Sequence, residues 1–124
     1  MNIPDNIYYT NDHEWIKFDN SIAIIGITDY AQSELGDIIF IEFKEIGLHC
    51  NIGDTIGTIE AVKTVADFYS PIEGNIAEIN PNLENGPDCV NKDPYDSGWF
   101  IKIDVLGKDR SALLSSIEYE KLIQ

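Results

Sequence analysis

Basic residues are scarce in this sequence. Eight Lys and Arg side chains, among which Arg110 is the only arginine, stand against 22 Asp and Glu, and the formal net charge is −14. This balance argues against nucleic acid and against anionic membrane surfaces as partners, because both carry phosphates. Two explanations of the acidity stay open: it keeps the protein soluble, or it steers the chain to basic docking patches on other proteins.

Histidine and cysteine are also few. His13 and His49 each lack a second ligand at the spacing of a metal site, so we expect no bound metal. Cys50 and Cys89 do not form a Cys-x-x-Cys motif, and no secretory signal precedes them. We interpret both as free thiols in a reducing compartment, although a fold that brought them together would allow one disulfide.

Long apolar runs are absent. No stretch of 18 apolar residues occurs, and the segment Met1–Asp5 is neither Arg-rich nor followed by an apolar run, so we expect a cytoplasmic protein without a membrane span. The 124 residues, 44% of them hydrophobic, fit one domain over residues 1–124 with a core of its own. No local catalytic signature such as a nucleophile elbow is found, so we do not expect an enzyme.

Most of the chain has the pattern of short strands separated by turn signals. The strands Trp15–Phe18 and Ser21–Ile27 flank Asp19-Asn20, which predicts a hairpin. A short helix is expected from Asp29 to Leu35, with Thr28 as its N-cap and a glycine at position 36 as its stop. The local signals are therefore strongest in the first third of the chain.

The later segments favour a mainly β sandwich or flattened barrel. Ile38–Phe43 is apolar on both faces, which predicts a central strand buried on two sides. Residues 82–97 show no periodicity and are expected to form an ordered surface loop. Residues 108–124 are expected to form two short helical turns, the first with Leu113 and Leu114 and the second capped by Ser115 or Ser116.

Lys63 is the residue around which a function can be built. It lies between two apolar, strand-forming runs, and no Gly or Pro stands between Gly57 and Pro71, so we place it near the tip of a hairpin on a tight turn. An exposed lysine at a turn is often only a solvated charge. The alternative is a covalent attachment point, since a long amine on a rigid tip suits a swinging prosthetic group.

Several short motifs stand in one order along nearly the whole chain. They are His13-Glu14-Trp15, Gly26–Gln32, Leu35-Gly36-Asp37, Glu60-Ala61-Val62-Lys63, Tyr69–Gly74, Val90–Tyr95 and Gly98-Trp99. In this order they resemble the H protein family of the glycine cleavage system, whose Glu-Ser-Val-Lys motif carries lipoate. The resemblance implies a lipoyl-domain-like β-sandwich, or flattened hybrid barrel, with short added helices that include a C-terminal one.

The resemblance also implies a carrier function. Lipoate would be joined covalently to Lys63 and would shuttle the aminomethyl group of glycine from the pyridoxal-phosphate glycine decarboxylase (P protein) to the tetrahydrofolate-dependent aminomethyltransferase (T protein). Electrons would pass to dihydrolipoyl dehydrogenase (L protein). Lipoylating enzymes would be further partners, and the chain itself is expected to be a monomer and not an enzyme.

Further site residues follow from the same resemblance. Glu60 and Gly74 occupy positions that the lipoylating enzyme reads, the first as a docking charge and the second as a turn glycine. Glu14 and Asp67 are expected at the cleft where the loaded arm rests, because a carboxylate can hold a protonated amine. Asp12 is a further candidate there, although it stands where the family commonly has serine.

Three alternatives remain open at this stage. Ala61, Thr64 and Lys44 differ from the commonest family residues, which leaves room for a paralogue that relays lipoate to other enzymes. A lipoyl or biotinyl domain of a multienzyme complex is a second alternative, but the Met-Lys-Met of biotinyl hairpins is absent and such domains are normally tethered to a larger chain. The third is an unmodified interaction protein that keeps the fold without the arm.

Overall fold

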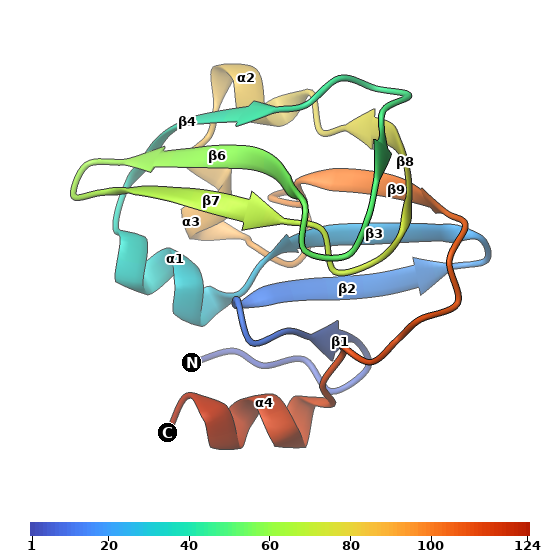
Figure 1. Cartoon of the computed structure of the whole chain (residues 1–124). Coiled ribbons are helices and arrows are strands. Elements are labelled where there is room, and N and C mark those ends of the chain that lie inside the picture. Colours follow the sequence, from blue (N-terminus) through green and yellow to red (C-terminus); the bar gives the residue numbers. More distant parts are fainter.

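The computed structural model describes residues 1–124, which form two β-sheets that enclose one core, with four short helices around them (Figure 1). The six-stranded sheet has the order β1-β2-β3-β9-β8-β5, and the three-stranded sheet has the order β4-β6-β7. In chain order the elements are β1 (Tyr8–Tyr9), β2 (Glu14–Asp19), β3 (Ile22–Ile27), α1 (Asp29–Leu35), β4 (Ile38–Phe43), β5 (His49–Cys50), β6 (Thr55–Ala61), β7 (Val65–Tyr69), β8 (Gly74–Ile79), α2 (Asn82–Asn85), α3 (Cys89–Lys92), β9 (Ile101–Val105) and α4 (Ser116–Leu122). The predicted mainly β fold with a C-terminal helix is confirmed.

The first hairpin and the helix after it form as predicted. Strands β2 and β3 pair antiparallel from Glu14 opposite Ile27 to Asp19 opposite Ile22. Helix α1 begins after Thr28, whose hydroxyl accepts a hydrogen bond from the backbone N–H of Ala31 at 3.1 Å. These local signals set the position of α1 beside the end of β3, where the cleft described below is found.

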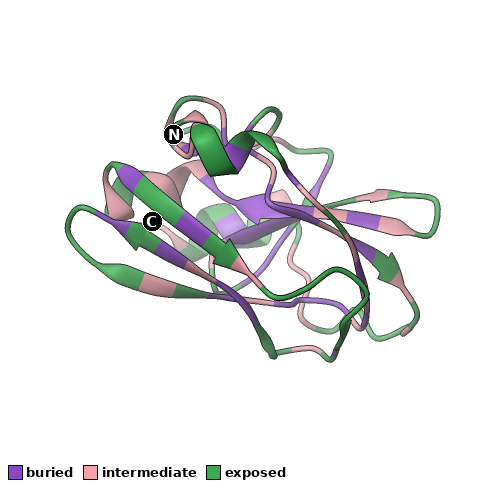
Figure 2. Ribbon diagram, turned by 90° about the horizontal axis from the view of Figure 1, so that it is seen from above, coloured by how far each residue is buried: buried purple, intermediate pink, exposed green.

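The core lies between the two sheets. Ile16, Ile25 and Ile103 of the six-stranded sheet pack in one cluster with Ile59 and Phe68 of the three-stranded sheet. Along β9, buried residues alternate with less buried ones, as expected where one face is covered (Figure 2). The first three residues of β2 and the last three of β3 are all buried, and Trp15 of β2 belongs to a second cluster with Tyr9 and Tyr119. Because both sheets contribute to one cluster, the β6–β7 hairpin is held by its inner face and its outer face stays exposed.

Strand β4 is not the central strand that its composition predicts. It lies at the edge of the three-stranded sheet and pairs only with β6. Ile38 and Ile41 are buried, but Ile39 and Phe40 are each 52% exposed, and the register shifts between Ile38 and Phe40. The prediction was wrong because apolar composition does not show which strand of a sheet will lack a neighbour.

The predicted surface loop over residues 82–97 contains two single-turn helices, α2 and α3. Elements of four residues are too short to show a 3.6-residue period, so the pattern could not reveal them. The amide of Asn80 donates to the carbonyl oxygens of Ser97 at 2.8 Å and Trp99 at 2.7 Å. These two bonds tie the start of the segment to its end.

The C-terminal segment has one helix where two helical turns were predicted. Ser115 caps α4, and its hydroxyl and the Glu118 carboxylate form a reciprocal capping box. Leu114 lies outside any helix, because its backbone exchanges hydrogen bonds with Tyr9 at 2.7 and 2.9 Å. Tyr119 is the fully buried residue of α4, whereas Ile117 is 66% exposed.

Cys50 is buried, Cys89 is half-buried, and no disulfide joins them. None of the four helices is long and apolar enough to cross a membrane.

Candidate functional site

Lys63 lies at the tip of the β6–β7 hairpin, as predicted. The backbone N–H of Ala61 donates to the carbonyl oxygen of Thr64 at 2.9 Å, so Val62 and Lys63 are the two central residues of the turn. Neither has a positive φ, so the turn forms without the glycine or asparagine that primed two-residue turns require. Lys63 is exposed and forms no ion pair, which leaves its amine accessible to a modifying enzyme.

The tip packs against the bend that follows α1. The N–H of Val62 donates to the carbonyl oxygen of Asp37 at 3.0 Å. The aliphatic stem of Lys63 crosses Gly36, with Cε 3.6 Å from the position that a Cβ on this glycine would occupy. Asn91 of α3 donates to the carbonyl oxygen of Gly36 at 2.8 Å and so fixes the bend from the other side. The backbone of the tip and the aliphatic stem of Lys63 are therefore held against this bend.

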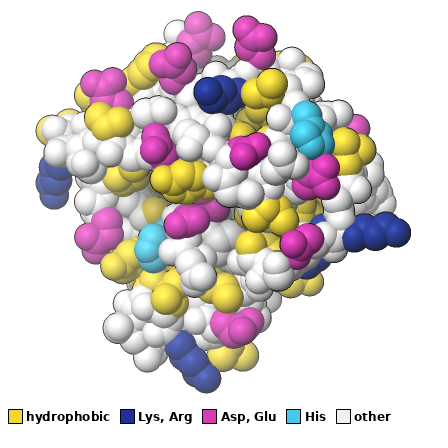
Figure 3. Space-filling model, in the orientation of Figure 1, with side chains coloured by type: hydrophobic (Ala, Val, Ile, Leu, Met, Phe, Trp, Pro, Cys, Tyr) yellow, Lys and Arg dark blue, Asp and Glu magenta, His cyan; other side chains and the backbone are white.

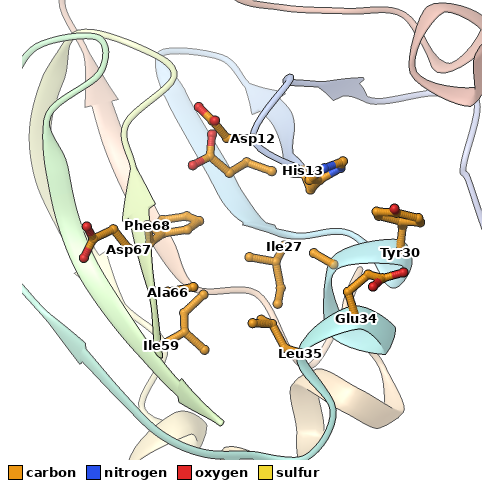
Figure 4. A pocket seen from close by; sticks show the side chains of 12 residues that line it. Asp12, His13, Ile27, Tyr30, Glu34, Leu35, Ile59, Ala66, Asp67 and Phe68 are labelled. Carbon is orange, nitrogen blue, oxygen red and sulfur yellow. The ribbon is translucent and has the colours of Figure 1, made fainter. Parts of the chain in front are cut away.

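A cleft of about 300 Å³ lies between α1, β7 and the β1–β2 loop (Figure 4). Its lining residues are Asp12, His13, Glu14, Ile27, Tyr30, Ala31, Glu34, Leu35, Ile59, Ala66, Asp67 and Phe68. Leu35 is the neighbour of Gly36, on which Lys63 rests, so this wall of the cleft is next to the lysine. The wall is mostly apolar, and its polar groups come from the β1–β2 loop, the start of β2, helix α1 and strand β7.

Glu14 is the buried carboxyl of this cleft, with 2% of its surface exposed. Its Oε1 accepts the hydroxyl hydrogen of Thr10 at 3.0 Å, and its Oε2 accepts the backbone N–H of Tyr69 at 2.9 Å. Burial raises the pKa of Glu14 to about 8, although these two hydrogen bonds lower it, and the charge of Asp12 adds to the rise. A cation placed beside Glu14 would favour its ionised form, because opposite charges stabilise each other.

The other two predicted cleft acids are placed differently. Asp12 is exposed at the rim, near enough to Glu14 to act on its charge. Asp67 lines the cleft, but Figure 4 shows its carboxylate turned away from the side to which Ala66 and Phe68 point. The backbone N–H of Tyr69 points away from β6 and donates to Glu14. Backbone groups two residues apart in a strand face the same edge, so the backbone N–H and C=O of Asp67 also face the cleft.

Glu60 and Gly74, the predicted recognition residues, lie outside the cleft. Glu60 is exposed on β6 opposite Val65, close to the tip. Gly74 begins β8 in the other sheet, where an added Cβ would lie 2.2 Å from the carbonyl oxygen of Asp104. Close packing against β9, and not a turn, is therefore the physical reason for glycine at this position.

Much of the cleft wall has no signal in the sequence. His13 stands out there only as an isolated histidine without a second metal ligand, yet it lines the cleft beside Tyr30 and Glu34 of α1. Its φ of 65° lies in the left-handed region, which histidine adopts more often than most residues other than glycine, but no sequence signal shows it here. The only available hint was that His13 directly precedes Glu14. No group of three or more His, Cys, Asp or Glu side chains is placed to hold a metal ion.

Acidic side chains are distributed over the surface and outnumber basic ones on the face drawn in Figure 3. The three ion pairs of the structure are His49 with Glu73, Lys92 with Asp88, and Lys102 with Glu78. Most of the 22 acidic side chains therefore have no ion-pair partner, in keeping with the net charge of −14.

The two-sheet fold and the exposed hairpin lysine define a protein of the lipoyl-domain type. The profile of the Glycine cleavage H-protein family matches residues 7–124. The chain belongs to this family.

Relatives and a solved structure agree with this membership. The chain is 48% identical over 124 residues to "Glycine cleavage system H protein" of Listeria monocytogenes serotype 4a (strain HCC23), with 99% of each chain covered. It is 50% identical over 122 residues to the protein of the same name in Listeria welshimeri, with 98% of each covered. The crystal structure of a glycine cleavage system H protein from Mycobacterium marinum has a TM-score of 0.87 at 33% identity, covering 96% of this chain and 97% of that one.

Proposed function

We propose that this chain is the lipoyl carrier of a glycine cleavage system, with lipoate joined by an amide bond to Nζ of Lys63. The observation that carries the proposal is the mostly apolar cleft that passes close to this lysine and also contains the buried carboxyl of Glu14. The accessible amine fits amide formation, and the apolar wall fits an aliphatic chain. The carboxyl fits an amine at the end of that chain.

The bound group supplies a dithiolane that takes up an aminomethyl group and two electrons. The chain's own residues hold and shelter the arm. Leu35, Ile59 and Phe68 exclude water from the cleft, and Glu14 accepts a hydrogen bond from the cargo's ammonium group. The carbonyl oxygen of Asp67, on the open edge of β7, is a second acceptor in place of its carboxylate.

We assign the partners from the family. A pyridoxal-phosphate decarboxylase loads the arm, an aminomethyltransferase unloads it to tetrahydrofolate, and dihydrolipoyl dehydrogenase reoxidises it. The chain itself performs no chemistry in this scheme and acts as one domain over residues 1–124. We assign Glu60, which is exposed beside the tip, to recognition by the lipoylating enzyme, and the free thiols agree with work in the cytoplasm.

The test is the intact mass of the protein expressed with and without lipoate. We expect the mass of one lipoyl group on the wild type and on Lys44→Arg and Lys92→Arg, and none on Lys63→Arg. Lipoate on another lysine, biotin, or a wild type that stays unmodified would overturn the proposal. Aminomethyl exchange with the decarboxylase would then separate a glycine-cleavage carrier from a protein that only relays lipoate.

A further inference from the structure

The C-terminal helix contacts the cleft wall through Tyr119, whose ring lies edge-on to the His13 ring at a centroid distance of 5.7 Å and whose hydroxyl group forms hydrogen bonds. Oη of Tyr119 lies 2.9 Å from Nδ1 of His13 and 2.7 Å from Oγ1 of Thr28. His13 is part of the cleft wall, and Thr28 caps the helix that supplies Tyr30 and Glu34 to it. Helix α4 contributes no lining residue of its own, so it acts on the cleft through Tyr119, and the hydroxyl group of this residue supplies the hydrogen bonds.

The hydrogen atoms of this cluster have one consistent direction. Thr28 is fully buried, and its Oγ1 already accepts the N–H of Ala31 at 3.1 Å. Oη of Tyr119 is the only acceptor within reach of the Thr28 hydroxyl hydrogen, and a buried hydroxyl needs one. We therefore assign the hydrogen of Tyr119 to the bond with Nδ1 of His13. This direction leaves the imidazole neutral, with its own hydrogen on Nε2.

His13 is held at further points. Its N–H donates to the carbonyl oxygen of Thr10 at 3.2 Å, and its carbonyl oxygen accepts the N–H of Thr28 at 3.0 Å. Its ring lies against Tyr30, with a centroid distance of 4.8 Å. The unusual φ of 65° is kept by these contacts, so the ring has a fixed place in the wall.

The charge state of His13 matters because acids surround it. Burial lowers its pKa, while Asp12 in the same loop and Glu34 on α1 raise it. Glu14 follows it directly and lines the same cleft, and Tyr30 and Tyr119 complete its ionisable neighbours. A protonated His13 would pair with these carboxylates and repel an ammonium group in the cleft.

We propose that Tyr119 is a positioning residue of the carrier: by donating to Nδ1 it keeps His13 neutral and fixed, so that the cleft carboxylates remain available to the ammonium cargo. The inference rests on the proposed function, and it extends the site to a helix that does not line the cleft. No covalent step is involved.

Tyr119→Phe is the test, and Tyr9→Phe is its matched control. Both tyrosines are fully buried and stack on each other at 4.7 Å, but the hydroxyl of Tyr9 donates to the carbonyl oxygen of Pro4. Imidazole ¹⁵N NMR should show a single tautomer of His13, with the hydrogen on Nε2, in the wild type and in Tyr9→Phe. Tyr119→Phe should show mixed tautomers and a titration midpoint of His13 at higher pH.

The second readout is the release of formaldehyde and ammonia from the isolated, loaded carrier. We expect Tyr119→Phe to release them about fivefold faster at pH 6, as for one lost hydrogen bond, with a smaller excess at pH 8, above the ordinary pKa range of histidine. Tyr9→Phe should match the wild type at both pH values. Asparagine tolerates a positive φ and cannot be protonated at position 13. When Tyr119→Phe is added to His13→Asn, we therefore expect no pH-dependent increase in the release rate. Comparison of His13→Asn with this double variant tests the inference if Tyr119→Phe alone folds poorly.

Unchanged tautomers in Tyr119→Phe, unchanged release, or an equal effect of Tyr9→Phe would each overturn the inference. These results are distinct from failure of the proposed function, which would appear as a wild-type chain without a lipoyl group on Lys63.

Discussion

The backbone N–H of Tyr69 donates to Oε2 of Glu14 at 2.9 Å, and this bond joins the strand that follows Lys63 to the first long strand of the other sheet. The hairpin that carries Lys63 and the carboxyl that we assign to the cargo of the proposed arm are thus directly connected. Movement of β7 would change the surroundings of Glu14.

The first prediction concerns stability and pH in Glu14→Gln. The pKa of Glu14 is about 8 in the folded chain against an ordinary value of 4.5, so the folded state binds this proton more tightly. Its stabilising contribution is complete below pH 4.5 and is lost as the pH rises through about 8. The wild type should lose up to about 1.4 kcal/mol per pH unit relative to Glu14→Gln in this window. Urea unfolding of both proteins at pH 5, 7 and 9 measures the difference. The same change of unfolding free energy with pH in wild type and Glu14→Gln would contradict the prediction.

The second prediction concerns shelter of the loaded arm. Glu14→Gln should be fully lipoylated but should release formaldehyde and ammonia faster, because a charge-assisted hydrogen bond of about 1.5–3 kcal/mol is lost, which is a factor of about 10–100. Asp67→Ala should behave as the wild type, since its carboxylate points away from the cleft. Equal release from wild type and Glu14→Gln would remove Glu14 from the site, and faster release from Asp67→Ala would restore the carboxylate to it.

The third prediction concerns docking to the decarboxylase. A carrier with a net charge of −14 is steered to basic surfaces, and this steering is screened over about 8 Å in physiological salt. The KM for the carrier should rise with ionic strength while kcat changes little. Glu60→Gln, which removes an exposed acid beside the tip, should raise KM at low salt and reduce its salt dependence. A KM independent of salt would mean that the acidity serves solubility.

The fourth prediction concerns Gly74→Ala. An added Cβ would lie 2.2 Å from the carbonyl oxygen of Asp104 and 2.6 Å from Cγ2 of Ile103, so the two strands must separate. We expect a loss of about 3 kcal/mol or more in unfolding free energy. Gly86→Ala is the control, because its Cβ would meet no atom closer than 3.5 Å. If Gly74 acts only through packing, the folded fraction of Gly74→Ala is lipoylated at the wild-type rate; slower lipoylation at equal folding would indicate direct recognition.

Local signals in the sequence predicted the elements that depend on neighbours in the chain. Helix α1 was found because Thr28 and Gly36 mark its two ends, and the tip position of Lys63 followed from the two runs around it. The edge position of β4 could not be found in this way, because Ile39 and Phe40 have the composition of a buried strand. Which strand lacks a neighbour is decided by contacts between distant segments.

The cleft was only partly predictable for the same reason. The family resemblance indicated Glu14, Asp67 and Asp12, and all three line it. It did not show that the Asp67 carboxylate points away, since this depends on the alternation of β7 against the core. The contact between His13 and Tyr119 joins residues that are 106 positions apart, and no pattern in one sequence reveals such a contact.

The turn at the tip of the hairpin sets few limits on its own sequence. Val62 and Lys63 have ordinary negative φ values, and both side chains are exposed, so almost any residue type fits the backbone there. The residues at these two positions are therefore free of the demands of folding. Val62 can change as the address for a modifying enzyme changes, while Lys63, which carries the amine, and the scaffold that presents it stay the same.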